Sequence, residues 1–150
     1  MKLTTTFFKT IMAMSVIVLF FSETKAQCST NIKKKCMPNI APFTPNGQAN
    51  TSTVVAGQKT EVSQTFYSGQ DYRIFICSDA VLGTCSFKVM DQSRKVLFDS
   101  QKNDAPDFWD FKSKSTQQLI VEVTTPTSQT TGSVLPSGCV TVLVGFKKDK

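Results

Sequence analysis

Histidine is absent from this 150-residue chain, and the sequence holds one tryptophan and two tyrosines. Without histidine, there is no Ser–His or Cys–His pair for nucleophilic catalysis and no imidazole ligand for catalytic zinc or haem. The sequence also lacks a glycine-rich phosphate loop, a dinucleotide fingerprint and a CxxC redox motif. These absences exclude the commonest enzyme classes and leave paired carboxylates as the remaining route to hydrolysis.

Long apolar runs are also scarce, and the one that occurs lies near the N-terminus. Residues 11–21 are apolar except for Ser15, and Lys2 and Lys9 precede them. Small residues stand at Thr24 and Ala26, the two positions that a signal peptidase reads. The run is shorter than the ~20 residues that span a bilayer. The pattern therefore predicts a signal peptide over residues 1–26, cleaved before Gln27, and an exported protein that is periplasmic or extracellular, with no transmembrane segment.

The chain from Gln27 onward is long enough for a single domain that buries about two-thirds of its unfolded surface. Its net charge falls from +6 to +4, because three lysines and one glutamate lie within residues 1–26. The basic residues are mostly scattered, which does not favour nucleic acid as a partner. We expect a monomer.

Five cysteines follow the predicted cleavage point, and an oxidising compartment favours disulfides between them. Because the number is odd, one thiol remains free, and two bridges among five cysteines allow 15 pairings. Proximity in the sequence favours a Cys28–Cys36 bridge, which leaves Cys77–Cys139 as the second. Cys85 alternates in phase with apolar neighbours, so we expect it to be buried and free.

The chain from Gln27 falls into two parts. Residues 27–50 show little periodicity, and they contain a short helix predicted near residues 28–37, three prolines and an Asn46-Gly47 turn signal. We interpret them as an arm that packs along the domain. From residue 51 the hydrophobic period changes to two. The predicted strands cover residues 51–55, 59–67, 70–77, 84–90, 95–98, 107–111, 116–124 and 139–146.

About eight short strands with regular turn signals and no long helix predict an all-β antiparallel sandwich over residues 51–150, with Greek-key or jelly-roll-like connections. Within it, residues 66–77 are expected to form the central hairpin. Gly69 supplies the turn, and Tyr72, Ile74 and Ile76 point into the core.

Two resemblances accompany this pattern. They rest on residues 67–73 and 87–91, on Trp109-Asp110-Phe111 and on Gly138-Cys139-Val140. In these motifs the chain resembles small exported proteins of Gram-negative bacteria that have no assigned activity. Residues 51–147 also resemble the bacterial prepeptidase C-terminal type of β-sandwich, whose modules accompany secreted hydrolases and are mostly non-catalytic. Neither resemblance implies catalytic residues.

An acidic segment is the best candidate for metal chemistry. It contains Asp99, Asp104, Asp107 and Asp110, with Lys102 among them. Carboxylates in a loop between strands are the oxygen ligands that Ca²⁺ prefers, although the spacing is not that of a known calcium loop. Two interpretations stay open, a Ca²⁺ site and an ordinary solvated loop, and no other cofactor is expected.

Aromatic residues are the candidates for ligand binding. Trp109 either stacks on a ligand such as a sugar or fills the core, and Tyr67 and Tyr72 flank the Gly69 turn with the same two alternatives. The Thr/Ser/Pro/Gly-rich segment 125–138 is a further candidate, because long loops are often functional or disordered.

These observations favour a non-catalytic exported module that binds an envelope protein or a glycan. The alternatives are a structural or accessory envelope protein without a small ligand, and a histidine-free hydrolase. A binding module predicts an exposed aromatic patch or groove, whereas a hydrolase predicts two carboxylates that face each other across a cleft.

Overall fold

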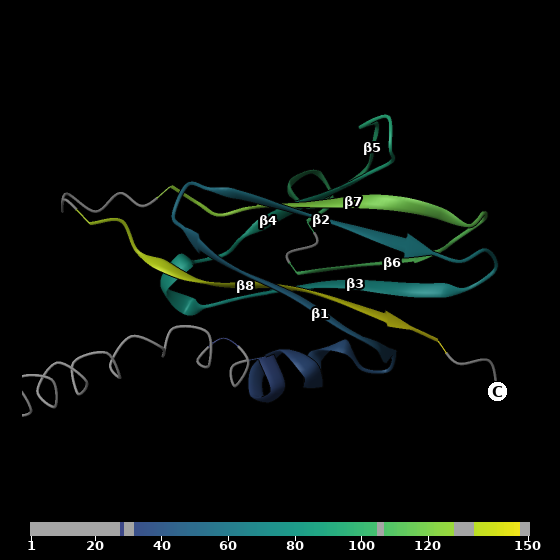
Figure 1. Cartoon of the computed structure of the whole chain (residues 1–150), viewed down its shortest axis with the longest axis horizontal. Coiled ribbons are helices and arrows are strands. Elements are labelled where there is room, and N and C mark those ends of the chain that lie inside the picture. Colours follow the sequence, from purple (N-terminus) through teal and green to yellow (C-terminus); the bar gives the residue numbers. More distant parts are fainter. Residues whose placement is uncertain (1–27, 29–31, 105–106, 128–133, 148–150) are drawn as a thin grey trace, which may run out of the picture.

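The computed structural model describes residues 28, 32–104, 107–127 and 134–147. Eight antiparallel strands form two four-stranded sheets that pack face to face (Figure 1). The predicted all-β sandwich is therefore confirmed, whereas the predicted signal peptide lies outside the described residues. Among the residues described, no helix is both long and apolar enough to cross a lipid bilayer.

The strand order is that of an eight-stranded jelly roll, in agreement with the predicted connections. Sheet A contains, in spatial order, β1 (Thr44–Val55), β8 (Ser137–Phe146), β3 (Asp71–Ser78) and β6 (Phe108–Lys112). Sheet B contains β2 (Lys59–Phe66), β7 (Gln117–Thr124), β4 (Ser86–Met90) and β5 (Val96–Asp99). Strands β1 and β2 therefore form one open side of the sandwich, and β6 and β5 form the other.

The first strand is longer than its periodicity suggests. It begins at Thr44 and so takes in the end of the segment that the sequence assigns to an arm. Its pairing with β8 is interrupted between Pro45 and Ala49, where Gly47 adopts a φ of 83°. The Asn46-Gly47 pair thus forms a bulge within an edge strand rather than a turn between elements. Proline and bulges are tolerated at an edge because one side of the strand is unpaired.

Residues 66–77 do not form a hairpin, which corrects the prediction from sequence. Strand β2 lies at the edge of sheet B, whereas β3 lies inside sheet A between β8 and β6. The connection around Gly69, whose φ is 82°, crosses from one sheet to the other. The sequence signals the turn and the two strands but not the sheet that each strand joins. Tyr72, Ile74 and Ile76 are buried as predicted.

The core lies between the two sheets and follows the alternation of the strands. Each strand from β2 to β8 contributes side chains from its inward face. Its buried members include Phe66, Tyr72, Ile74, Ile76, Phe87, Val89, Phe98, Leu119, Val121, Val123, Val140, Val142 and Val144. Burial of this many large apolar side chains is the main stabilising contribution, since each contributes about 1.5–3 kcal/mol.

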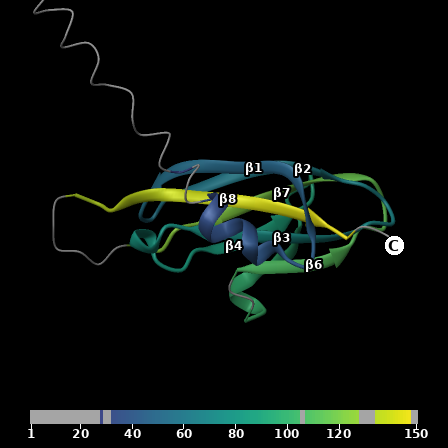
Figure 2. The same ribbon diagram turned by 90° about the horizontal axis from the view of Figure 1, so that it is seen from below.

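Two helical turns cover the outer face of sheet A (Figure 2). They are η2 (Ile32–Cys36) and η3 (Met37–Ile40), where the sequence predicts one short helix. Ile40 packs with Phe75 and Leu143 in a second apolar cluster on that face. A Cβ on Gly145 would approach Ile40 to 2.8 Å, so a residue without a side chain is required there. The turns explain why β3 and β8 are buried on both faces.

An arginine fastens the chain after η3 to the sheet. The Arg73 guanidinium carbon lies 4.7 Å from the centroid of the Phe43 ring and 4.5 Å from that of Phe108. Its Nε and Nη2 donate to the two carboxylate oxygens of Asp110 at 2.7 Å, and Nη1 donates to the carbonyl of Ala41. The hydrogen bonds to Asp110 raise the pKa of Arg73, which is therefore a permanent cation between two rings.

Two disulfides join the four cysteines expected to be bonded, but in a different pairing. Cys28 bonds to Cys139, and Cys36 bonds to Cys77. The predicted pairs Cys28–Cys36 and Cys77–Cys139 are therefore wrong. Both bridges tie residues before β1 to strands of sheet A. Cys36, at the end of η2, reaches β3 because η2 lies against that strand, and Cys28 reaches β8. Nearness in sequence does not decide the pairing here, because the segment before β1 crosses the neighbouring strands β8 and β3 and bonds to each of them.

Cys85 is free and buried, as predicted. Burial raises the pKa of its thiol, so the reactive thiolate is disfavoured up to and beyond the usual value of about 8.5. At pH 8 we therefore expect iodoacetamide to leave the folded protein unmodified and to add one carbamidomethyl group after unreduced unfolding. Mass spectrometry with peptide mapping measures this. Labelling of the folded protein, or of any other cysteine, would contradict the assignment.

Candidate functional site

A groove lies along the open side of the sandwich where β1 and β2 separate. The two strands are edge strands of different sheets and are joined by a short turn at residues 56–58. At the other end they diverge and leave a cavity of about 710 Å³. Its volume falls within the range of small-ligand sites. It is lined by Asn46, Gln48, Ser63, Gln64, Thr65, Tyr67, Gln70, Tyr72 and Phe146.

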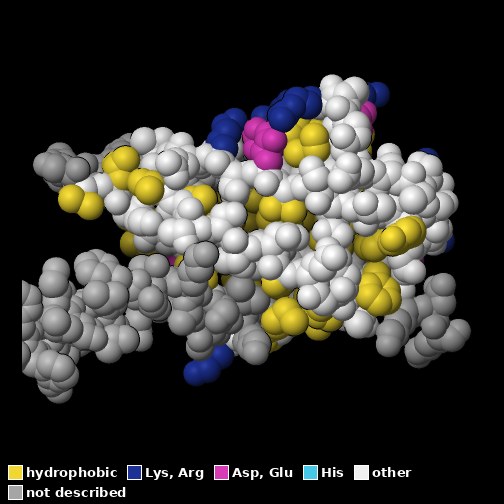
Figure 3. All heavy atoms as spheres, viewed as in Figure 1, with side chains coloured by type: hydrophobic (Ala, Val, Ile, Leu, Met, Phe, Trp, Pro, Cys, Tyr) yellow, Lys and Arg dark blue, Asp and Glu magenta, His cyan; other side chains and the backbone are white. Residues whose placement is uncertain are grey.

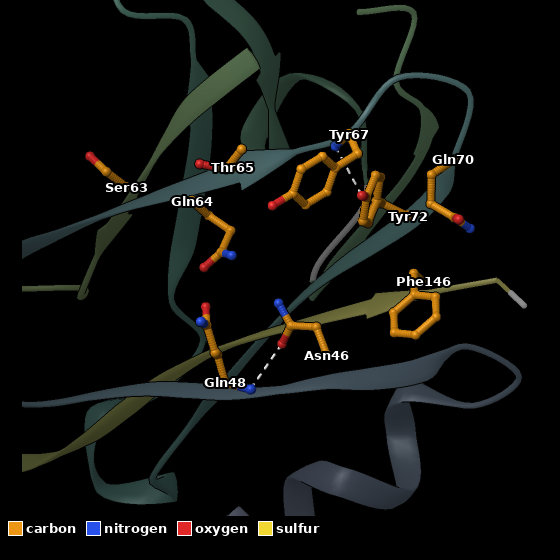
Figure 4. A pocket seen from close by; sticks show the side chains of 9 residues that line it. All are labelled: Asn46, Gln48, Ser63, Gln64, Thr65, Tyr67, Gln70, Tyr72 and Phe146. Carbon is orange, nitrogen blue, oxygen red and sulfur yellow. Dashed lines mark hydrogen bonds between the residues drawn. The ribbon is translucent and has the colours of Figure 1, made fainter. Parts of the chain in front are cut away.

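Amide side chains from the two sheets face one another across this groove (Figure 4). Gln64 points from β2 toward Gln48 of β1, and Asn46 extends into the same space. The bulge in β1 fixes Asn46, whose Oδ1 accepts from the backbone N–H of Gln48 at 3.0 Å. The side-chain amides of Gln48 and Gln64 make no hydrogen bond with any other described residue. Both amides are therefore available to a ligand.

Gln64 is unusual for its position in the strand. It alternates in phase with Val62 and Phe66, which pack against the core. An inward-facing position in a sandwich strand normally carries an apolar residue. Here an amide occupies it, so the space between the sheets is polar at this end instead of being closed by apolar packing.

Aromatic residues form the other end of the groove. Tyr67 is 64% exposed, and its backbone N–H donates to the hydroxyl of the buried Tyr72 at 3.0 Å. Beneath them, Phe66 contacts the Tyr72 ring edge-to-face, with centroids 4.9 Å apart. Gln70 donates from Nε2 to the carbonyl of Lys147. The main chain of Tyr67 is thus held by the buried Tyr72, and the Tyr67 ring is exposed at this end of the groove.

None of the described residues that line the groove is charged. The charged residues at the other end of β2 are matched, since Lys59 pairs with Glu122 and Glu61 pairs with Arg94. Over β1 and β2 the visible surface consists mainly of uncharged polar groups, with the basic and acidic side chains toward its margins (Figure 3). A ligand of this groove would meet hydrogen-bonding groups and an aromatic ring, and no ionic partner.

Of the aromatic candidates named from the sequence, the structure brings Tyr67 and Tyr72 together in the groove and places Trp109 elsewhere. The Trp109 ring stacks between Phe98 and Phe111, with centroids 5.0 Å and 4.3 Å away, and packs against the core. This placement favours the core interpretation of Trp109 over the ligand-platform interpretation. In segment 125–138, residues 128–133 lie outside the described residues.

The acidic candidates lie in different surroundings, and two of them are held by basic side chains. Asp99 is buried beside Lys88, with 3.7 Å between Oδ2 and Nζ, and its Oδ1 accepts from the backbone N–H of Gln101. Asp110 is held by Arg73, as described above. Asp104 has a φ of 48°, and the Asp107 carbonyl accepts from the backbone N–H of Ile76. In the described part of the chain, no three cysteine or acidic side chains are grouped so that they could hold a metal ion.

The groove residues Asn46, Gln48 and Gln70 could not be identified from the sequence. Asn46 and Gln48 lie in a segment without periodicity, and Gln70 lies in the connection between β2 and β3. One signal was present, because Gln64 interrupts the apolar face of its strand. That signal does not reveal which residues lie opposite, since the partner strand belongs to the other sheet.

No protein-family model and no curated protein sequence matches the chain, so the resemblance to prepeptidase C-terminal modules has no support from a family model. Among solved structures, the chain is similar to Aeromonas hydrophila PliG, a periplasmic lysozyme inhibitor of g-type lysozyme. The two share 9% sequence identity with a TM-score of 0.49, over 71% of this chain and 89% of the other.

Proposed function

We propose that this protein is a non-catalytic binding module of the bacterial envelope, in the periplasm or outside the cell, and that the groove between β1 and β2 is its ligand site. The observation that carries the proposal is the arrangement of unpartnered amides and an exposed tyrosine around one polar cavity. A protein with a purely structural role has no need for amides on the inward face of an edge strand, where apolar residues would be more stabilising.

The chemistry of the groove supports binding rather than catalysis. Among the described residues, its lining contains no carboxylate, thiol, lysine or arginine, and the chain contains no histidine. Histidine, carboxylates and lysine are the side chains that most often carry out general acid–base catalysis. Export is supported by the two disulfides, which are typical of proteins in oxidising compartments.

Tyr67→Ala is the variant that tests the proposed function. We expect it to weaken binding to a Gram-negative envelope extract by about tenfold or more, because exposed aromatic anchors often dominate the free energy of binding. Biolayer interferometry with the immobilised full chain, purified after export, measures the change.

Leu97→Ala is the matched control, since Leu97 is 42% exposed on β5 at the opposite edge of sheet B. The proposal expects the control to bind like the wild type. Equal binding by all three proteins would place the binding site elsewhere. Absence of binding by the wild type would favour a structural role.

A further inference from the structure

We infer that the ligand of the groove is an uncharged oligosaccharide, an inference that rests on the proposed function and adds the class of ligand. Three features of the groove lead to it: amides that both donate and accept, an exposed aromatic ring, and the lack of charge. Each feature matches one property of a neutral sugar chain.

The amides match the hydroxyl groups of a sugar. A carboxamide offers two donors and a carbonyl acceptor, and a hydroxyl offers one donor and two acceptor lone pairs. Gln48 and Gln64 can therefore engage neighbouring hydroxyls from opposite sides of the same ring, because they extend toward each other from β1 and β2 (Figure 4). Their lack of partners in the described part of the chain means that binding breaks no existing contact of these amides.

The tyrosine matches the apolar face of a sugar ring, on which C–H groups are exposed. Tyr67 presents most of its surface to solvent, yet its main chain is held by the Tyr72 hydroxyl. An aromatic side chain of this kind offers a large contact area and loses little conformational entropy on binding. It lies at one end of the groove, and the amides lie along the rest.

The lack of charge separates this ligand from acidic sugars and charged peptides. In the part of the chain that the structure describes, the lining contains no lysine or arginine to pair with a carboxylate or phosphate, although the chain as a whole is basic. A peptide strand can extend a regular sheet edge. Pro45 and the bulge of β1 interrupt that regularity on one side of the groove, whereas β2 keeps an unbroken register on the other side.

The test is isothermal titration calorimetry of the full chain, purified after export, with chitopentaose, cellopentaose and maltopentaose. An acidic pentagalacturonate serves as the charged comparison. We expect at least one neutral sugar to bind with a Kd of about 1 mM or lower, and the acidic sugar to bind at least tenfold more weakly. Tyr67→Ala should weaken the affinity for the neutral sugar by about tenfold or more, and Gln64→Ala should weaken it by about three- to tenfold.

Two further variants keep the test specific. Tyr67→Phe retains the aromatic ring, so its Kd for the neutral sugar should stay within about threefold of that of the wild type. Gln101→Ala removes an exposed amide beyond β5 and should leave the Kd unchanged. Far-ultraviolet circular dichroism checks that each variant is folded. Failure of all three neutral sugars, preferential binding of the acidic sugar, or an unchanged Kd in Tyr67→Ala would overturn the inference. If the envelope extract still bound in a Tyr67-dependent way, only the sugar assignment would fall; if that binding were also absent, the proposed function would fall with it.

Discussion

Phe66→Ala is expected to lower the free energy of unfolding by about 3–5 kcal/mol, as is usual when a buried phenylalanine is truncated. The Phe66 side chain is fully buried at the end of β2, and its ring makes edge-to-face contacts with Tyr72 and Phe111 at 4.9 Å and 5.2 Å. The substitution leaves a cavity between the sheets and removes both ring contacts, which add to the loss of apolar burial. Urea denaturation followed by tryptophan fluorescence measures the change, because Trp109 stacks on Phe111.

The adjacent residue provides a close control for this prediction. Tyr67→Ala changes a side chain that is mostly exposed, so its free energy of unfolding should stay within about 0.5 kcal/mol of that of the wild type. A loss below about 1 kcal/mol for Phe66→Ala would mean that Phe66 is not packed between the sheets. The pair also separates the two roles that we propose at the groove, since Phe66 is packed in the core beneath it and Tyr67 is exposed to the proposed ligand.

Removal of the Cys36–Cys77 bridge should have the second large effect. The double variant Cys36→Ala/Cys77→Ala is expected to lose about 2–4 kcal/mol, because the bridge closes a long loop with a sequence separation of 41 residues in the unfolded chain. The bridge also anchors η2 and η3 over Phe75 and Leu143. We therefore expect faster amide hydrogen exchange in these turns and on β8, in addition to the lower free energy of unfolding.

Cys85→Ala controls for the loss of a cysteine as such. Cys85 is buried but takes part in no disulfide, so its replacement should cost roughly 1 kcal/mol or less. A similar loss in the control and in the double variant would show that the bridge contributes little. Retained protection of η3 in the double variant would show that apolar contacts alone hold the arm in place.

The strands were predictable because the alternation of apolar and polar residues within each strand is visible in the local sequence. Alternation in β7 and β8 identified Leu119, Val121, Val140 and Val142 as inward-facing, and all four are buried. The burial of Leu143 on the outer face of sheet A was not predictable from local pattern. It depends on η3, which lies about a hundred residues earlier in the sequence and folds over the sheet. The predicted disulfide pairing was wrong for the same reason, because the true pairs join that early segment to strands of sheet A.

The candidate site was predictable only in part. Tyr67 and Tyr72 stood out as scarce residues beside a turn, and both line the groove. The amides opposite them come from a bulge whose position is set by pairing between β1 and β8. Such pairing brings together residues distant in the sequence, and local patterns do not encode it. The groove exists because β1 and β2 belong to different sheets.

The most direct test of the account is nuclear magnetic resonance on the uniformly ¹⁵N-labelled protein, titrated with a soluble Gram-negative envelope extract. Side-chain NH₂ groups of asparagine and glutamine give separate signals, so the groove can be observed through the groups that define it. If the groove is the ligand site, the signals of Asn46, Gln48 and Gln64 will shift or broaden, while those of Gln101 and Asn103 beyond β5 stay unchanged. Changes confined to the β5 edge, or no change at Gln48 and Gln64 when the extract binds, would contradict it.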